Sequence, residues 1–210
     1  MLLPIVAVLI RQQFNISFVA LLVYFSITFL YNLLFIAFPD FPRDARRVIG
    51  IANNFLDVPL ILLFLRHFCT SERVKKMLNI SLMCFMIFEL IIVAIHGFTV
   101  TAISIFEGPG IILILAFSFH FFTRYVKRAF SHKSEIAKTL MASGILFAYS
   151  VYFLVFLFYY VLKTPHKIDA LIVYFFASLV ASVLIAIGLL TFNVKPADGR
   201  RQTAAVRWQA

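Results

Sequence analysis

Residues 77–123 read MLNISLMCFMIFELIIVAIHGFTVTAISIFEGPGIILILAFSFHFFT, an apolar run in which Glu89 and Glu107 are the only acidic or basic residues other than histidine. The hydrocarbon core of a bilayer takes about 20 apolar residues per helix. This run is therefore long enough to cross a membrane twice, and it must turn once. The tetrapeptide His96-Gly97-Phe98-Thr99 offers the breaker for that turn. The sequence predicts a tight hairpin there, between spans at about 77–97 and 99–123.

The rest of the chain has the same character. Of its 210 residues 63% are hydrophobic and 13% are charged, whereas soluble domains carry about 25% charged residues. This composition excludes a soluble globular fold. The predicted fold class is all-α, a polytopic membrane bundle of six transmembrane helices in a single membrane domain, residues 1–193. The four further spans are predicted at about 14–38, 48–66, 139–162 and 169–193.

The N-terminal apolar run, residues 1–10, is too short to span a bilayer alone. It is predicted to form a short interfacial segment or an extension of the first span. A seventh span that includes this segment is the main alternative.

Basic residues set the predicted orientation. The net charge of +10 comes from short segments between apolar runs, which is the positive-inside pattern of membrane proteins rather than a signal for nucleic acid. Five of the 19 basic residues fall on one side, namely Arg43, Arg46, Arg47, Lys163 and Lys167, and the other fourteen on the opposite side. We expect a multi-pass protein of the cell membrane with both termini cytoplasmic, including a basic, disordered tail at 194–210.

The sequence also leads to expectations about partners and cofactors. The bilayer itself is the expected partner, anionic lipid could bind the cytoplasmic basic loops, and a second copy or another protein could pack against the helices. Nucleic acid is not expected. The common nucleotide, zinc-protease and hydrolase motifs are absent from the sequence, so no cofactor is expected, while a metal is left open. Cys69 and Cys84 are expected to be reduced thiols.

Three carboxylates interrupt the apolar spans: Asp57, Glu89 and Glu107. An ionised carboxylate facing lipid costs several kcal/mol, so such residues usually face the bundle interior and are often functional. At 100° per residue, Asn53 and Asn54 share a helical face with Asp57. The sequence therefore predicts one interior site that contains all three carboxylates. The alternative is that protonated acids merely hold helices together by hydrogen bonds.

A polar column is predicted on the third span. Glu89 and His96 are seven residues apart, so they differ by about 20° around the helix and stand about 10 Å apart along it. His96 would lie at the outer surface and could accept protons there. A simple headgroup position for His96 is the alternative.

Prolines lie close to two of the carboxylates. Pro59 follows Asp57, and Gly108-Pro109-Gly110 follows Glu107. Because proline removes a helical hydrogen bond, the fourth span is predicted to kink or to be interrupted at this point. Interrupted helices at mid-depth form the ion and substrate sites of many transporters. An ordinary proline kink, which membrane helices tolerate, is the alternative.

These features favour a small transporter or channel that moves a cation, a proton or a proton-coupled solute through a carboxylate site in the membrane. Two other classes stay open. One is a membrane-embedded enzyme that acts on a lipid, and the other is a sensor or assembly subunit of a membrane complex. No motif in the sequence identifies a reaction or a substrate.

Overall fold

The computed structural model of the chain describes residues 2–11, 15–38, 42–130, 135–162 and 167–192. All of its regular structure in these ranges is helical. The seven α-helices are α1 Leu2–Arg11, α2 Ile16–Ala37, α3 Arg43–Leu65, α4 Glu72–His96, α5 Val100–Ala129, α6 Ile136–Phe156 and α7 Lys167–Thr191. A 3₁₀ turn, η1 Arg66–Phe68, extends α3, and a π-helical turn, η3 Leu157–Val161, extends α6.

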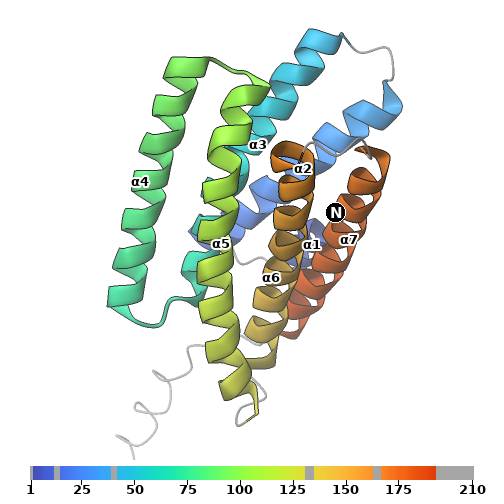
Figure 1. The fold of residues 1–210 in the computed structure, drawn as a ribbon. Coiled ribbons are helices and arrows are strands. Elements are labelled where there is room, and N and C mark those ends of the chain that lie inside the picture. The colour runs from blue at the N-terminus through green and yellow to red at the C-terminus, as the bar shows by residue number, and fades with distance from the viewer. Residues whose placement is uncertain (1, 12–14, 39–41, 131–134, 163–166, 193–210) are drawn as a thin grey trace, which may run out of the picture.

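Six of these helices, α2 to α7, are long and apolar enough to cross a membrane, which confirms the predicted all-α class and number of spans. Figure 1 shows α4 at one edge of the bundle and α5 beside it. α6 packs against both α5 and α7, α2 packs against α3, and α4 packs against α5 and α3. Buried residues from all seven helices form one hydrophobic core.

The predicted hairpin between the third and fourth spans is confirmed. α4 ends at His96, and Gly97 takes a φ of 67°, a conformation that glycine adopts without the steric cost of a side chain. Thr99 then caps α5, because its hydroxyl oxygen accepts a hydrogen bond from the backbone N–H of Ala102 at 3.3 Å. The short turn makes α4 and α5 antiparallel neighbours.

The N-terminal segment is a short helix that belongs to the bundle. α1 packs against α7 and α2, and its residues Pro4, Ala7 and Val8 are buried. The Arg11 guanidinium donates hydrogen bonds to the backbone carbonyls of Leu190 and Phe192 at the end of α7. With ten residues, α1 extends about 15 Å, half the thickness of a bilayer core. It does not supply a seventh span.

The glycines beside Pro109 make room for neighbouring helices. α5 runs from Val100 to Ala129 without a break. The sequence predicted either a kink or an interruption at this site, and the structure excludes the interruption. A Cβ atom on Gly108 would lie 2.8 Å from the Phe156 ring, and one on Gly110 would lie 2.6 Å from Val58 Cγ2. The helix continues because proline removes only one backbone hydrogen bond, while the glycines allow α3 and α6 to approach. α3 likewise continues through Pro59.

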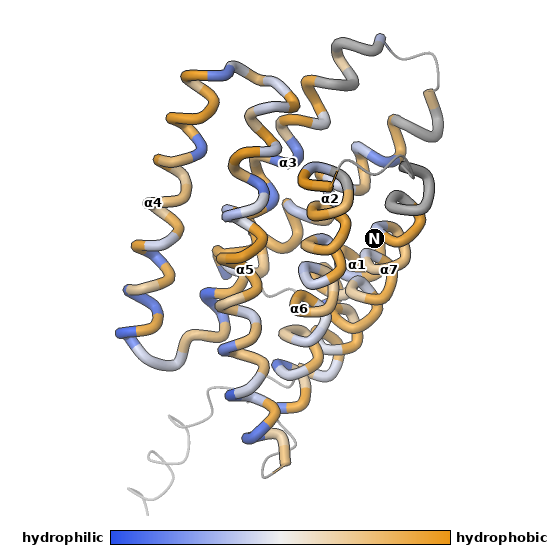
Figure 2. The backbone as a smooth tube through the Cα atoms, viewed as in Figure 1, coloured by the Kyte–Doolittle hydropathy of each residue, from blue (hydrophilic) through white to orange (hydrophobic). Residues whose placement is uncertain are grey.

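Most of the basic residues in the described part of the chain lie at one end of the bundle. Figure 2 shows hydrophilic residues at the lower ends of α4 and α5, which carry Arg73 and Lys75 on α4 and Lys127 and Arg128 on α5. This arrangement is the one that the positive-inside pattern requires. The orientation in the membrane stays a prediction, and the predicted tail at 194–210 lies outside the described residues.

Labelling of introduced cysteines tests the orientation. Asp44 and Lys167 lie at the first turns of α3 and α7, and Figure 1 shows these two turns at the same end of the bundle. We expect Asp44→Cys and Lys167→Cys to react with an impermeant maleimide from outside the cell and not from inside. Labelling of the two positions from opposite sides would contradict the six-span topology.

The background for this labelling needs both native thiols removed. Cys69 is half-buried and Cys84 is exposed, and both are free. Burial raises the pKa of the Cys69 thiol, which lowers the fraction of reactive thiolate. A Cys69→Ser, Cys84→Ser protein without introduced cysteines is the control, and it should give no signal.

Candidate functional site

A cavity of about 510 Å³ lies among α2, α3, α5, α6 with its extension η3, and α7. Four of the residues predicted to form the site line it, namely Asn53, Asn54, Asp57 and Glu107. The other polar residues of the lining are Tyr24, Thr28, Tyr31, Asn32, Tyr152, Tyr160 and Tyr174. The cavity is therefore polar on several sides although the surrounding helices are apolar.

The cavity extends toward the end of the bundle that is opposite to the basic residues. Asn53 comes from the first half of α3, Tyr31 from the second half of α2 and Tyr174 from the first third of α7. These three parts of the helices lie at the end where α2 is followed by α3 and α6 by α7 (Figure 1). In the predicted orientation this end faces the outside of the cell.

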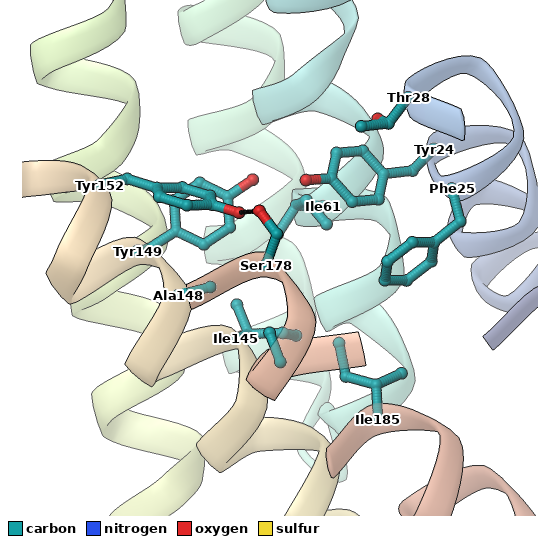
Figure 3. Close-up of a pocket in the computed structure, with 11 residues that line it drawn as sticks. Tyr24, Phe25, Thr28, Ile61, Ile145, Ala148, Tyr149, Tyr152, Ser178 and Ile185 are labelled. Atoms are coloured by element: carbon teal, nitrogen blue, oxygen red, sulfur yellow. Dashed lines mark hydrogen bonds between the residues drawn. The ribbon is translucent and has the colours of Figure 1, made fainter. Parts of the chain in front are cut away.

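Asp57 is anchored by a tyrosine. The Tyr149 hydroxyl donates a hydrogen bond of 2.6 Å to Asp57 Oδ1. Figure 3 shows the hydroxyl groups of Tyr24 and Tyr149 pointing toward one another. The bond from Tyr149 stabilises a carboxylate that no cation among the described lining residues neutralises. Asp57 is thus held in one position at mid-span.

Glu107 faces the same cavity from α5. Its Oε2 atom is buried and has no hydrogen-bond partner within the part of the chain that the structure describes. Both of its sequence neighbours pack tightly, since Gly108 contacts the Phe156 ring and Phe106 meets Phe55 edge to face at 6.2 Å. An unpaired buried carboxylate oxygen is costly, so this atom is a natural binding point for a proton or a cation.

The two asparagines lie on the Asp57 face of α3, as the helical geometry predicts. Asn53 Oδ1 accepts a hydrogen bond of 3.5 Å from the Thr28 hydroxyl, which connects α3 to α2. Asn54 lies one residue further along the cavity wall. The amides place additional donors and acceptors beside the carboxylates.

A smaller chamber of about 20 Å³ adjoins the cavity and shares Tyr24, Thr28 and Tyr152 with it. Figure 3 shows the hydrogen bond of 2.6 Å between the hydroxyls of Tyr152 and Ser178 at this chamber. Isoleucines line its other side, namely Ile61, Ile145 and Ile185. Because a single water needs about 10–15 Å³, the chamber holds at most a water or two. It marks the inner limit of the polar region.

Below these isoleucines the bundle is packed with large aromatic side chains. Phe64, Phe68, Phe121 and Tyr125 are all completely buried. The Tyr125 hydroxyl donates a hydrogen bond of 2.6 Å to the Phe68 carbonyl, which ties α5 to the end of α3. Among the described residues, these aromatic side chains fill the core of the half that is cytoplasmic in the predicted orientation.

Glu89 and His96 lie outside the cavity lining. Glu89 is fully buried, in register with Leu78, Leu82 and Phe85 on the inner face of α4, and neither of its carboxylate oxygens has a hydrogen-bond partner among the described residues. His96 is exposed at the end of the same helix. The structure thus places two of the three predicted carboxylates on one cavity, and the predicted column on α4 lies outside its lining.

The tyrosines of the site did not follow from the sequence reasoning, which concentrated on acids and prolines. A signal for them is present, because Tyr24, Tyr149, Tyr152 and Tyr174 fall inside apolar runs. A buried tyrosine hydroxyl usually finds a hydrogen-bond partner. Tyrosines at mid-span therefore indicate polar partners nearby.

Removal of the Tyr149 hydroxyl tests the anchoring of Asp57. Tyr149→Phe leaves one oxygen of a buried carboxyl without its donor, and we expect a loss of about 1–3 kcal/mol in the free energy of unfolding. Thermal unfolding of the purified protein in detergent measures it. In an Asp57→Leu background the same substitution should cost clearly less. An equal cost in both backgrounds would show that the hydrogen bond does not anchor Asp57.

No family model, no curated protein and no solved structure matches this chain. The fold by itself is that of an integral membrane protein with six apolar helices. Any function must therefore be argued from the chemistry of the cavity.

Proposed function

We propose that the protein is a small transporter or channel that binds a cation, a proton or a proton-coupled solute in the cavity and moves it across the membrane. The observation that carries this proposal is the shared position of Asp57 and Glu107 on one cavity of about 510 Å³. Two carboxylates in one low-dielectric space favour positive charge. No lysine, arginine or histidine is among the described residues that line the cavity.

The position of the cavity in only one half of the bundle supports a transport cycle. The polar cavity occupies one half, and completely buried aromatic side chains fill the other half. Alternating access requires a site that opens to one side of the membrane at a time. In this proposal the described conformation is outward-facing, and passage to the cytoplasm requires Tyr125 and Phe68 to separate.

Reconstitution into liposomes tests the proposal. The full chain is inserted into vesicles loaded with a pH-sensitive dye. A proton gradient is imposed first, and Na⁺, K⁺ and choline gradients follow in the presence of a protonophore, so that the dye reports the charge that each cation carries. We expect at least one gradient to dissipate faster than in protein-free vesicles. A panel without any flux, for inorganic and organic cations alike, would contradict the proposal.

A ligand-binding sensor is the second candidate, favoured by the packed aromatic half of the bundle. A sensor would bind the same kind of ligand in the same cavity without moving it. Saturable binding by a protein that shows no flux distinguishes this function from transport.

A further inference from the structure

We infer that the ligand of the cavity is an organic cation, a protonated amine or a quaternary ammonium compound, rather than a bare metal ion. This inference rests on the proposed cation-binding function of the cavity. It follows from three properties of the lining, namely its size, its charge and its aromatic rings.

The size of the cavity favours an organic ligand. Its volume of about 510 Å³ falls within the range of about 300–1,000 Å³ that is typical of sites for small organic molecules. A dehydrated metal ion needs a compact shell, for Ca²⁺ six to eight oxygens at about 2.3–2.6 Å. Among the described residues there is no group of three or more His, Cys, Asp or Glu side chains that could hold a metal.

The charge of the lining selects a cation. Asp57 and Glu107 are the ionisable acids of the cavity, and Glu107 Oε2 is buried without a hydrogen-bond partner in the described part of the chain. A protonated amine close to this atom would donate the missing hydrogen bond, and a quaternary ammonium group would supply a compensating charge. A neutral ligand leaves the two carboxyl groups without a compensating charge, and an anion adds repulsion.

Aromatic rings cover much of the remaining wall, from Tyr24, Tyr31, Tyr152, Phe156, Tyr160 and Tyr174. The rings of Tyr152 and Tyr174 stack at a centroid distance of 4.5 Å with an angle of 23° between their planes. The hydrogen bond between the hydroxyl groups of Tyr152 and Ser178 holds the Tyr152 ring of this pair in place. Rings and carboxylates together recognise alkylammonium groups, because the ring faces attract the positive charge while they pack against its carbon atoms.

Binding of a charged probe and its neutral isostere tests the inference. Choline and 3,3-dimethylbutan-1-ol have the same shape and differ in charge, and benzyltrimethylammonium adds a ring. Titration calorimetry on the full chain in lipid nanodiscs measures all three. We expect at least one of the two ammonium probes to bind saturably, and we expect Asp57→Asn to lower its affinity at least about tenfold. If choline binds, the neutral alcohol should bind at least about tenfold more weakly than choline.

Two variants of Tyr152 distinguish the contribution of its ring to binding from that of its hydroxyl group. Tyr152→Phe keeps an aromatic ring and should retain ammonium binding, whereas Tyr152→Leu should lose about tenfold in affinity. Phe119→Leu, at a position on α5 that is 61% exposed and outside the cavity lining, is the control and should bind as the wild type does. Equal effects of Tyr152→Phe and Tyr152→Leu would contradict a role of the ring.

The outcomes distinguish this inference from the proposed function. If the protein dissipates proton or alkali-metal gradients but binds neither ammonium probe, the organic-cation inference is wrong and cation transport stands. Ammonium binding without any flux supports the inference and contradicts transport. If neither binding nor flux is observed, both are wrong.

Discussion

Asp57→Asn and Glu107→Gln are each expected to reduce cation or proton flux in liposomes by about tenfold or more, close to the rate of protein-free vesicles. Both substitutions remove an ionisable carboxyl group and keep nearly the same shape. Asp57 is anchored by the 2.6 Å hydrogen bond from Tyr149, and an asparagine oxygen can accept the same bond. The fold should therefore survive while the attraction for a cation is lost. The initial rate of dye response after a gradient is imposed measures the effect.

Glu89→Gln is the matched control for these two variants. Glu89 is also a carboxylate inside a span, and it is fully buried, but it does not line the cavity. If the cavity is the pathway, Glu89→Gln should keep most of the wild-type flux. Loss of flux in Glu89→Gln together with normal flux in Asp57→Asn would contradict the cavity as the pathway.

Gly188→Val is expected to cause the largest loss of stability, about 1–3 kcal/mol or more. A Cβ atom at this position would lie 2.8 Å from the Ala137 carbonyl oxygen and 3.1 Å from the Met141 backbone nitrogen. Because these are backbone atoms, the overlap is relieved only if α6 and α7 move apart. Small residues at such contacts allow membrane helices to pack closely. Thermal unfolding in detergent measures the change.

Ile187→Val is the control for this variant. Ile187 is 44% exposed on the same helix, so a valine there meets no neighbouring backbone, and the melting temperature should stay nearly unchanged. Gly188→Ala should fall between the two. If Gly188→Val melts at the wild-type temperature, the close α6–α7 contact does not contribute to stability as the structure indicates.

The number of membrane spans and the hairpin at Gly97 could be predicted from the sequence, because both follow from apolar length and local backbone chemistry. The face shared by Asn53, Asn54 and Asp57 could also be predicted, since it depends only on the geometry of one helix. The position of Glu89 outside the cavity lining could not be predicted from the sequence. It depends on which side of α4 meets α3 and α5, and nothing local to the span determines the neighbours of a helix.

The segment after Glu107 shows a second limit of sequence reasoning. Gly108-Pro109-Gly110 has the composition of a helix break, yet α5 continues through it. A glycine can either allow an unusual backbone conformation or allow close packing of a neighbouring helix. Gly108 and Gly110 have the second role here, because Phe156 and Val58 pack against them. Local composition therefore predicted the site correctly as unusual, and it did not determine the conformation.

Accessibility of a cavity residue tests the central claim most directly, that this cavity is the route of a cation. Asn54→Cys places a thiol on the cavity wall, and Leu56→Cys, 37% exposed at a position outside the lining, is the control on the same helix. Both are made in a Cys69→Ser, Cys84→Ser background, and an impermeant thiol reagent is applied from outside. We predict that the reagent modifies Asn54→Cys, that this modification stops cation flux, and that the transported cation slows the modification. Leu56→Cys should show none of these effects. Unchanged flux after complete modification of Asn54→Cys would contradict the claim.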